Sequence, residues 1–274
     1  MTLLAWFVLQ ATDSPWLVAL VGFFGMAPLL ALGPLGGVLA DTMDRQSVIR
    51  VTQTTNLLSA MLMTIVLFAN IDQFWYAYPV IAIVGVGWAL DMPSRRSAIH
   101  DLLGRPGVTN GFALDSVGMS ASSMLGPALG GGIIAMTSIT GGFASVVGLY
   151  LASLVLVWQV QLPSSTGEGS KMSIVRDLKD SVRYVARNQA LLAAVMVTVV
   201  MNLLLFPYQN MVPVIARDLL DAGPGLMGLL QALPGLGALV GGIFVASLTS
   251  IRYHGRFYIG GSLVALSGLL AFSF

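Results

Sequence analysis

Long apolar runs, separated by short polar turns, set the pattern of this sequence. They lie at about residues 1–11, 16–40, 48–69, 74–91, 107–136, 141–161, 190–212, 225–248 and 257–274. None alternates apolar and polar residues with a period of two, as a strand of a membrane barrel would. All but the first approach or exceed the ~20 apolar residues with which an α-helix crosses a bilayer. The pattern therefore predicts an all-α polytopic membrane protein, with about seven complete transmembrane helices and two truncated ones.

Composition agrees with this interpretation and narrows the class of protein. Of the 274 residues, 56% are hydrophobic and only 9% are Asp, Glu, Lys or Arg, whereas a soluble domain carries about 25% charged residues. A soluble enzyme, a disordered protein and a nucleic-acid binder are excluded. The absence of cysteine excludes disulfides, thiolate catalysis and zinc–cysteine sites.

The basic residues give the orientation of the predicted helices. All but one of the thirteen lie in the loops that follow the second, fourth, sixth and eighth runs; the exception, Arg217, stands beside Asp218. Because cytoplasmic loops carry the excess of Lys and Arg, we expect the loops at 41–50, 91–106, 162–189 and 249–256 to be cytoplasmic. We expect the membrane to be a plasma membrane of the bacterial type.

A single long connection follows the sixth run, as two packed six-helix halves would require. We therefore divide the chain into an N-terminal half at 1–161, a linker at 162–189 and the start of a C-terminal half at 190–274. The linker has an apolar face and predicts an amphipathic helix on the cytoplasmic surface. The first run covers only about 17 Å, and Phe274 ends an apolar run, so we expect a fragment cut within its first and ninth helices.

The end of the second run combines small residues with charge. Gly33, Gly37 and Asp41 are four residues apart, so they share one helix face on which another helix can pack closely. Arg45 lies four residues beyond Asp41 and is placed to pair with it. A helix cap beside a tight turn is the alternative interpretation.

These residues resemble a known family. Gly37, Asp41, Asp44 and Arg45 match the signature of the loop between helices two and three in the major facilitator superfamily. The resemblance implies a charge relay that latches the two halves in the outward-facing state. Thr42 and Gln46 stand where basic residues are usual, which implies a weaker relay.

The fifth run carries a second motif. Gly118, Ser122, Gly126 and Gly130 repeat every fourth residue, a stripe that lets two helix backbones approach closely. A generic packing face is the alternative. The motif Gly126-Pro127-x-x-Gly130-Gly131 is similar to that of the superfamily's drug–proton antiporters.

Other segments resemble the subgroup that includes enterobactin and macrolide exporters. They begin at Pro93, Asn110, Phe206 and Pro234. The resemblance implies a twelve-helix protein, of which part of the first helix and about the last three lie outside this chain.

Ionisable groups inside a bilayer are costly and default to functional candidates. Asp91 and Arg95 are four residues apart, and Asp115 stands where the subgroup suggests Asn. These three residues either contact protons or substrate or form an ion-pair network that only fixes packing.

The uncharged candidates are Asn202, Gln209, Asn210 and Gln231. Pro207 and Pro213 predict a broken helix beside them, and interhelical hydrogen bonds are the alternative role for the amides. The polar stripe of Thr52, Thr55, Asn56 and Ser59 is interpreted as packing.

These observations lead to one functional hypothesis and three rivals. We expect proton-coupled efflux of a small amphipathic solute by alternating access, in contact with membrane lipids, by a monomer that needs neither cofactor nor metal and binds no nucleic acid. An uptake symporter would share the Asp41 loop but would not need the helix bend that Gly126-Pro127 predicts in the fifth run. An intramembrane enzyme would need a paired acid, Ser–Lys or His–acid constellation, which we do not find. The third rival is a non-transporting membrane scaffold.

Overall fold

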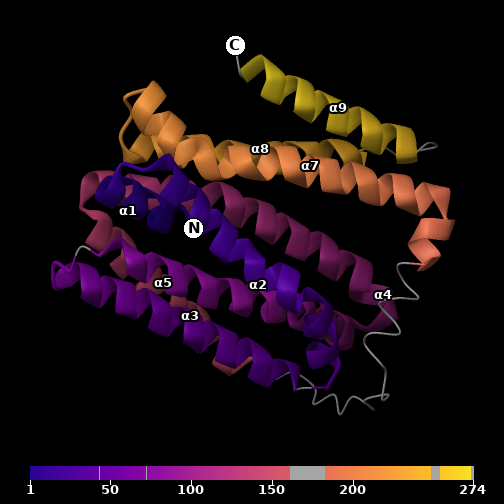
Figure 1. Ribbon diagram of the computed structural model, residues 1–274. Helices are drawn as coiled ribbons and strands as arrows, with labels where there is room; N and C mark the ends of the chain where they lie inside the picture. The colour runs from indigo at the N-terminus through magenta and orange to yellow at the C-terminus, as the bar shows by residue number, and fades with distance from the viewer. Residues whose placement is uncertain (43, 72, 161–182, 248–253, 273–274) are drawn as a thin grey trace.

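The chain forms a bundle of long helices (Figure 1). The computed structural model describes residues 1–42, 44–71, 73–160, 183–247 and 254–272. The elements are α1 (Thr2–Thr12), α2 (Pro15–Thr42), α3 (Arg45–Phe68), the 3₁₀ turn η1 (Phe74–Tyr76), α4 (Ala77–Met136), α5 (Ile139–Gln159), α7 (Gln189–Val214), the π-helical turn η2 (Ile215–Leu219), α8 (Pro224–Ser247) and α9 (His254–Phe272). Each predicted apolar run corresponds to one of these helices or to part of one.

Helix α4 contains two of the predicted runs. Its 60 residues would span about 90 Å as one straight helix, three times the ~30 Å of a bilayer core. Gly104 interrupts it with φ 59° and ψ −178°, a conformation that only glycine adopts without steric cost. A Cβ atom at Gly111 would lie 2.6 Å from Ile99 Cγ2, so the two parts fold back on each other beside this break. We call residues 77–103 the first part of α4 and residues 105–136 the second part.

Length and hydropathy fit membrane crossing. Within the described residues, six helical segments are long and apolar enough to span a bilayer, one of them the continuous Phe74–Met136, and Thr2–Thr12 and Tyr258–Ala271 are shorter apolar helices. Large apolar side chains face outward: Leu30 is 80% exposed and Val264 is 73% exposed. Such a surface suits lipid rather than water, and the prediction of an all-α polytopic membrane protein is confirmed.

The α1–α2 turn has the features that its sequence predicts. Asp13 ends α1 in the left-handed conformation, with φ 50°, and its backbone N–H donates to the carbonyl of Leu9. Pro15 then begins α2, a position that suits proline because the first helical N–H has no partner within the helix.

The buried core lies at the end of the bundle that contains Asp13, which we call the Asp13 end. Residues 4–9 of α1 are buried there together with Met63 of α3, Ile81 and Ile134 of α4, and Met227 of α8. We call the opposite end, with Arg45, Arg95 and Arg105, the basic end. The core joins α1–α5 to α8, so apolar packing holds the two predicted halves together at the Asp13 end.

Helix α7 corrects one prediction. We expected a break near Pro207 and Pro213, but α7 is continuous from Gln189 to Val214 and changes only afterwards into η2. The irregular turn therefore follows Pro213. In this turn the N–H of Leu220 donates to the carbonyl of Ile215, five residues back, as in a π-helix. The predicted amphipathic linker lies mostly outside the described residues; residues 183–187 at its end are helical.

Candidate functional site

A cavity of about 740 Å³ lies between the predicted halves, and we call it the central cavity. Helices α1, α2 and both parts of α4 line it from one side, and α7 and α8 line it from the other. Its polar lining consists of Thr2, Ser123, Tyr208, Gln209, Asn210 and Gln231. Ligand cavities of similar size are typically apolar with a few placed polar groups, and Met26, Trp88 and Leu230 supply apolar surface here.

Three of the four predicted amides meet in the central cavity. Gln231 on α8 accepts a hydrogen bond from the hydroxyl of Thr2 on α1. This bond crosses between the halves, so one amide both lines the cavity and bridges its walls.

Asn210 packs against the backbone of the opposite helix. A Cβ atom at Gly22 on α2 would lie 2.5 Å from Asn210 Cγ, a separation that real Cβ atoms do not reach. Gly22 thus provides the notch into which the Asn210 side chain fits. The sequence did not single out Gly22, because its role depends on a helix almost two hundred positions away.

Asn202 does not belong to this group. Its Nδ2 donates to the carbonyl of Thr198 at 2.7 Å, one turn back on the same helix, and the cavity lining does not include it.

A second cavity, of about 240 Å³, lies beside the first within α3, α4 and α5, and we call it the side cavity. It brings together the three predicted ionisable residues, Asp91, Arg95 and Asp115. Trp88 lines both cavities and so stands where they adjoin. The clustering that we expected from the sequence is therefore present, at the basic-end side of Trp88.

Asp91 already has partners in the side cavity. Arg95 donates to its Oδ2 at 2.8 Å, and Thr52 donates to its Oδ1 at 3.4 Å. The Asp91 side chain is only 11% exposed, so its charge is compensated by an ion pair and a hydroxyl.

Asp115 differs from Asp91 in having no partner. Among the described residues it makes no hydrogen bond or ion pair, although it is half-buried and lines the same cavity. Asn56 lines this cavity too, and its buried Oδ1 accepts no hydrogen bond. Of the polar stripe predicted on α3, Asn56 forms part of the cavity wall, together with the neighbouring Gln53, which the stripe did not include.

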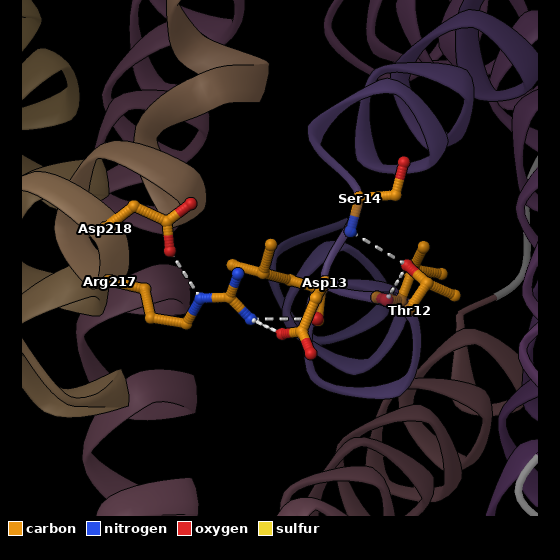
Figure 2. A network of polar contacts seen from close by, with 7 residues as sticks. Thr12, Asp13, Ser14, Arg217 and Asp218 are labelled. Carbon is orange, nitrogen blue, oxygen red and sulfur yellow. Dashed lines mark hydrogen bonds and ion pairs between the residues drawn. The ribbon is translucent and has the colours of Figure 1, made fainter.

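A polar network closes the Asp13 end between the two halves (Figure 2). Arg217 of η2 donates through Nη1 to Asp13 Oδ1 at 2.6 Å and to the carbonyl of Leu9 at 3.0 Å, and through Nε to Asp218 at 2.7 Å. Figure 2 shows the Arg217 guanidinium between the two carboxylates. Asp218 lies on η2, the same element as Arg217, and Asp13 lies on the α1–α2 turn. We call the Arg217–Asp13 contact the Asp13 latch.

The second part of α4 meets α8 backbone to backbone near the same end. A Cβ atom at Gly131 would lie 2.8 Å from Gly228 Cα, and one at Gly235 would lie 2.5 Å from Met124 N. This crossing needs glycine at both helices.

The predicted stripe on the fifth run is therefore only partly correct. A Cβ atom at Gly118 or Gly126 would meet nothing within 4 Å, and one at Gly130 would meet only Leu3. Met124, Pro127 and Gly131 form the actual contact face, rotated around the helix from the face that includes Gly118, Gly126 and Gly130.

The loop after α2 shows different partners from those that its motif implies. Asp44 caps α3: Ser47 donates to its Oδ2 through the backbone N–H at 2.9 Å and the hydroxyl at 2.6 Å. These two bonds hold the pKa of the Asp44 carboxyl below its usual value. Arg45 pairs with Asp101 on α4 and donates to the carbonyl of Ser97. The surroundings of Gly37 and the side chain of Asp41 lie outside the described part of the structure.

Several site residues escaped the sequence analysis. Asp101 and Tyr150 carry no local signal, because only the packing of α3 and α5 against α4 gives them their positions. Asn56 did have a signal, the polar stripe on an apolar helix, whereas Gln53 lies beside that stripe and was not singled out. No group of three or more metal-ligating side chains was found in the part of the chain that the structure describes.

Comparison with known proteins gives consistent matches. The model of a family described as "Transmembrane secretion effector" matches residues 2–272. The uncharacterized MFS-type transporter YfiS of Bacillus subtilis is 24% identical over 84% of this chain and 55% of its own length. Macrolide efflux protein A of Streptococcus pyogenes is 20% identical over 96% of this chain and 67% of its own length. The staphyloferrin A transporter of Staphylococcus aureus is 20% identical over 97% and 68% respectively.

The matched relatives are longer than this chain. It spans between about half and about two thirds of the length of these three proteins. No solved structure matches it significantly.

Proposed function

This chain belongs to the transmembrane secretion effector family of the major facilitator superfamily, and from that premise we propose that its protein exports a small amphipathic solute. The solute binds in the central cavity, and alternating access moves it across a bacterial plasma membrane. Relatives named as a macrolide efflux protein and a staphyloferrin A transporter support a small-molecule cargo. An enzymatic role has no support among these relatives, which are transporters.

The central cavity carries this proposal. It lies between the two halves, where a rocking motion would expose it to either side in turn. Apolar surface from Met26 and Trp88 faces the amides of Asn210 and Gln231, a combination that suits a solute with an apolar body and hydrogen-bonding groups.

The packing of the halves supports an inward-facing state for this conformation. The Asp13 latch and the Gly131–Gly228 contact join the halves at one end. Toward the basic end, Cβ atoms at Gly118 of α4 and at Gly241 of α8 would meet nothing within 4 Å. The positive-inside rule assigns the basic end to the cytoplasm, so the halves separate on the cytoplasmic side.

The motif in the loop after α2 is consistent with this inward-facing state. The relay that the family resemblance implies, with Gly37, Asp41, Asp44 and Arg45, would latch the cytoplasmic ends in the outward-facing state. In the inward-facing state Arg45 is paired with Asp101 within its own half. We propose that Arg45 leaves Asp101 when the cytoplasmic ends close.

Proton coupling is part of the proposal. The side cavity, which shares Trp88 with the central cavity, holds two carboxylates, Asp91 and Asp115, and either could exchange a proton while the cavity is open to the cytoplasm. The proton gradient would supply the energy, with no cofactor and with the full-length protein acting as a monomer.

The amides of the central cavity provide the test. Everted membrane vesicles containing the natural gene product would be energised, and uptake of the amphipathic dye ethidium would be followed by fluorescence. Gln231→Leu and Asn210→Leu each remove one hydrogen-bonding group, worth about 1 kcal/mol, and should weaken apparent affinity roughly fivefold.

Asn202→Leu is the matched control, because Asn202 bonds to its own helix outside the cavity. Ethidium uptake should survive this change. Equal impairment by Asn202→Leu and Gln231→Leu would refute the cavity as the binding site, and energy-driven accumulation only in right-side-out vesicles would favour the uptake symporter.

A further inference from the structure

A groove of about 320 Å³ lies between α3, the first part of α4 and α5 near the basic end, and we call it the α3–α5 groove. It shares no lining residue with the central cavity, and Figure 1 shows α3 and α5 on the side of the bundle away from α7 and α9. Its apolar wall consists of Ile49, Ile99, Leu102, Leu156, Val157 and Val160. Leu156 is 62% exposed and Leu102 51%, so the groove opens on the outer surface of the bundle, which faces lipid in a membrane.

Polar groups that line the groove have partners within the protein. Gln46 donates through Nε2 to the carbonyl of Val160 at 2.6 Å and so ties α3 to the end of α5. Arg95 is the cation of the lining, and it donates to Asp91 at 2.8 Å. A charged ligand of the groove would therefore need a further cation at its edge.

Arg50 is such a cation. It lies on α3 between Gln46 and Gln53, four and three residues away, and so shares the helix face that lines the groove. Its guanidinium carbon lies 4.5 Å from the centroid of the Trp158 ring on α5, and this stacked pair joins the two helices beside the groove. In the described part of the chain the guanidinium forms no ion pair, and its enclosed Nε has no hydrogen-bond partner.

Acidic residues at this end of the bundle have other partners. Asp101 pairs with Arg45. The pKa of the Asp44 carboxyl is lowered chiefly by the hydrogen bonds from Ser47, and the charge of Arg50 is the smallest of the causes. The positive charge of Arg50 is thus available to an anion from outside the protein.

We propose that the α3–α5 groove binds an anionic phospholipid, with an acyl chain against the apolar wall and the phosphate on the guanidinium of Arg50. Arginine forms bidentate, charge-assisted hydrogen bonds with phosphate, and its long side chain can reach the headgroups from an apolar surface. Trp158 suits the same depth, since tryptophan concentrates at the membrane–water interface.

The orientation of the bundle favours an anionic lipid. The positive-inside rule assigns the basic end to the cytoplasm, and basic pockets between helices on that side are suited to anionic headgroups. A zwitterionic lipid offers the same phosphate, but its ammonium group would be repelled by Arg50. This lipid is distinct from the transported solute, because the groove and the central cavity have separate linings.

The test measures lipid retained by the natural gene product in detergent. Native mass spectrometry would follow titrations with phosphatidylglycerol and with phosphatidylcholine of the same acyl chains, which has no net charge. Phosphatidylglycerol should bind more tightly, and Arg50→Gln should weaken its binding roughly tenfold. Arg50→Lys keeps the charge and should lose less. Arg96→Gln is the matched control, because Arg96 is exposed and does not line the groove.

A second pair of variants tests the apolar wall. Val157→Phe would fill part of the groove and should lower phosphatidylglycerol binding. Val155→Phe makes the same change on α5 at a position that is 57% exposed and outside the lining, and it should leave binding unchanged. Thermal unfolding without added lipid would show that both variants are folded.

Several results would overturn the proposal. Equal binding of the two lipids would remove the role of charge, and equal losses in Arg50→Gln and Arg96→Gln would remove the role of Arg50. Displacement of phosphatidylglycerol by inorganic phosphate would show a site for the free anion instead of a lipid. A protein dimer that Val157→Phe dissociates, with lipid binding unchanged, would assign the groove to a second copy of the chain.

Discussion

At the residue scale, two aspartates in functional motifs turn out to have local partners. Asp44 stands within the relay motif but accepts two hydrogen bonds from Ser47 at the start of α3, the arrangement of a helix N-cap. Asp91 stands among the proton candidates but is bound to Arg95 and Thr52. The four-residue spacing of Asp91 and Arg95 allowed for their ion pair, which the structure contains. The Thr52 contact comes from another helix and has no local signal in the sequence.

The Asp44 cap gives a prediction for stability. Asp44→Ala should lower the free energy of unfolding by about 1 kcal/mol through loss of the cap, and Asp44→Asn should cost less, since asparagine also caps helices. Unfolding of the detergent-solubilised protein would be followed by circular dichroism.

The pH dependence of this effect has a definite sign. The folded-state pKa of Asp44 is lowered, chiefly by the hydrogen bonds from Ser47. The stabilisation is therefore present above the unfolded pKa and is lost as the pH falls through the lower folded value. The difference between wild type and Asp44→Ala should shrink in strong acid; a difference that grows there would contradict the assignment.

At the scale of elements, the contact of α4 with α8 is the structural result that differs most from the motif-based prediction. The glycine-rich fifth run was expected to present Gly118, Gly126 and Gly130 to a neighbour, but Gly131 makes the backbone contact with Gly228. Small residues at every fourth position identify a helix face that allows close packing. Which residues of that face touch another helix depends on how the neighbouring helix packs against it. The α4 break at Gly104 and the α1–α2 turn, by contrast, follow from local chemistry, and the pattern of runs and turns located both segments.

Alanine substitutions can distinguish the face of α4 that contains Gly131 from the face that contains Gly126. Gly131→Ala would place a methyl group 2.8 Å from Gly228 Cα, and relieving such overpacking typically costs about 1–3 kcal/mol. Gly126→Ala is the matched control, with nothing within 4 Å of the added carbon. Thermal unfolding should show a lower midpoint for Gly131→Ala alone. Equal midpoints for the two variants would mean that the α4–α8 crossing is not as close as described.

The Asp13 latch gives a prediction about the conformational equilibrium. Asp13 is 81% exposed and Arg217 26%, so their ion pair should be worth about 0.5–1 kcal/mol. Arg217→Gln should therefore increase the outward-open population roughly two- to fivefold. The measurement is the rate at which a maleimide, added from the Asp13 side, modifies a Ser123→Cys cysteine in the central cavity.

Two controls make the latch prediction specific. Asp218→Asn leaves the Arg217–Asp13 contact in place and should change the maleimide rate less. The charge swap Asp13→Arg with Arg217→Asp should return the rate toward that of the parent protein. An unchanged rate in Arg217→Gln would show that the latch does not hold this end closed.

At the scale of the whole molecule, the two ends of the bundle make different contacts. Apolar packing, the Asp13 latch and a glycine crossing join the halves at the Asp13 end. Toward the basic end, a Cβ atom at Gly118 or Gly241 would meet nothing within 4 Å. The central cavity lies between α2 and α7 and between the second part of α4 and α8. Helix class and family followed from apolar runs and short motifs. The cavities required the tertiary approach of helices far apart in sequence, as the Gly22–Asn210 notch illustrates.

The most direct test of alternating access is to lock the Asp13 end shut. The chain contains no cysteine, so Asp13→Cys with Arg217→Cys would introduce a unique pair within it, to be joined by a reducible bifunctional thiol reagent. Ethidium transport by vesicles containing the natural gene product with these substitutions should stop when the pair is joined and return after reduction. Transport that continues at an unchanged rate with the pair fully joined would contradict the account.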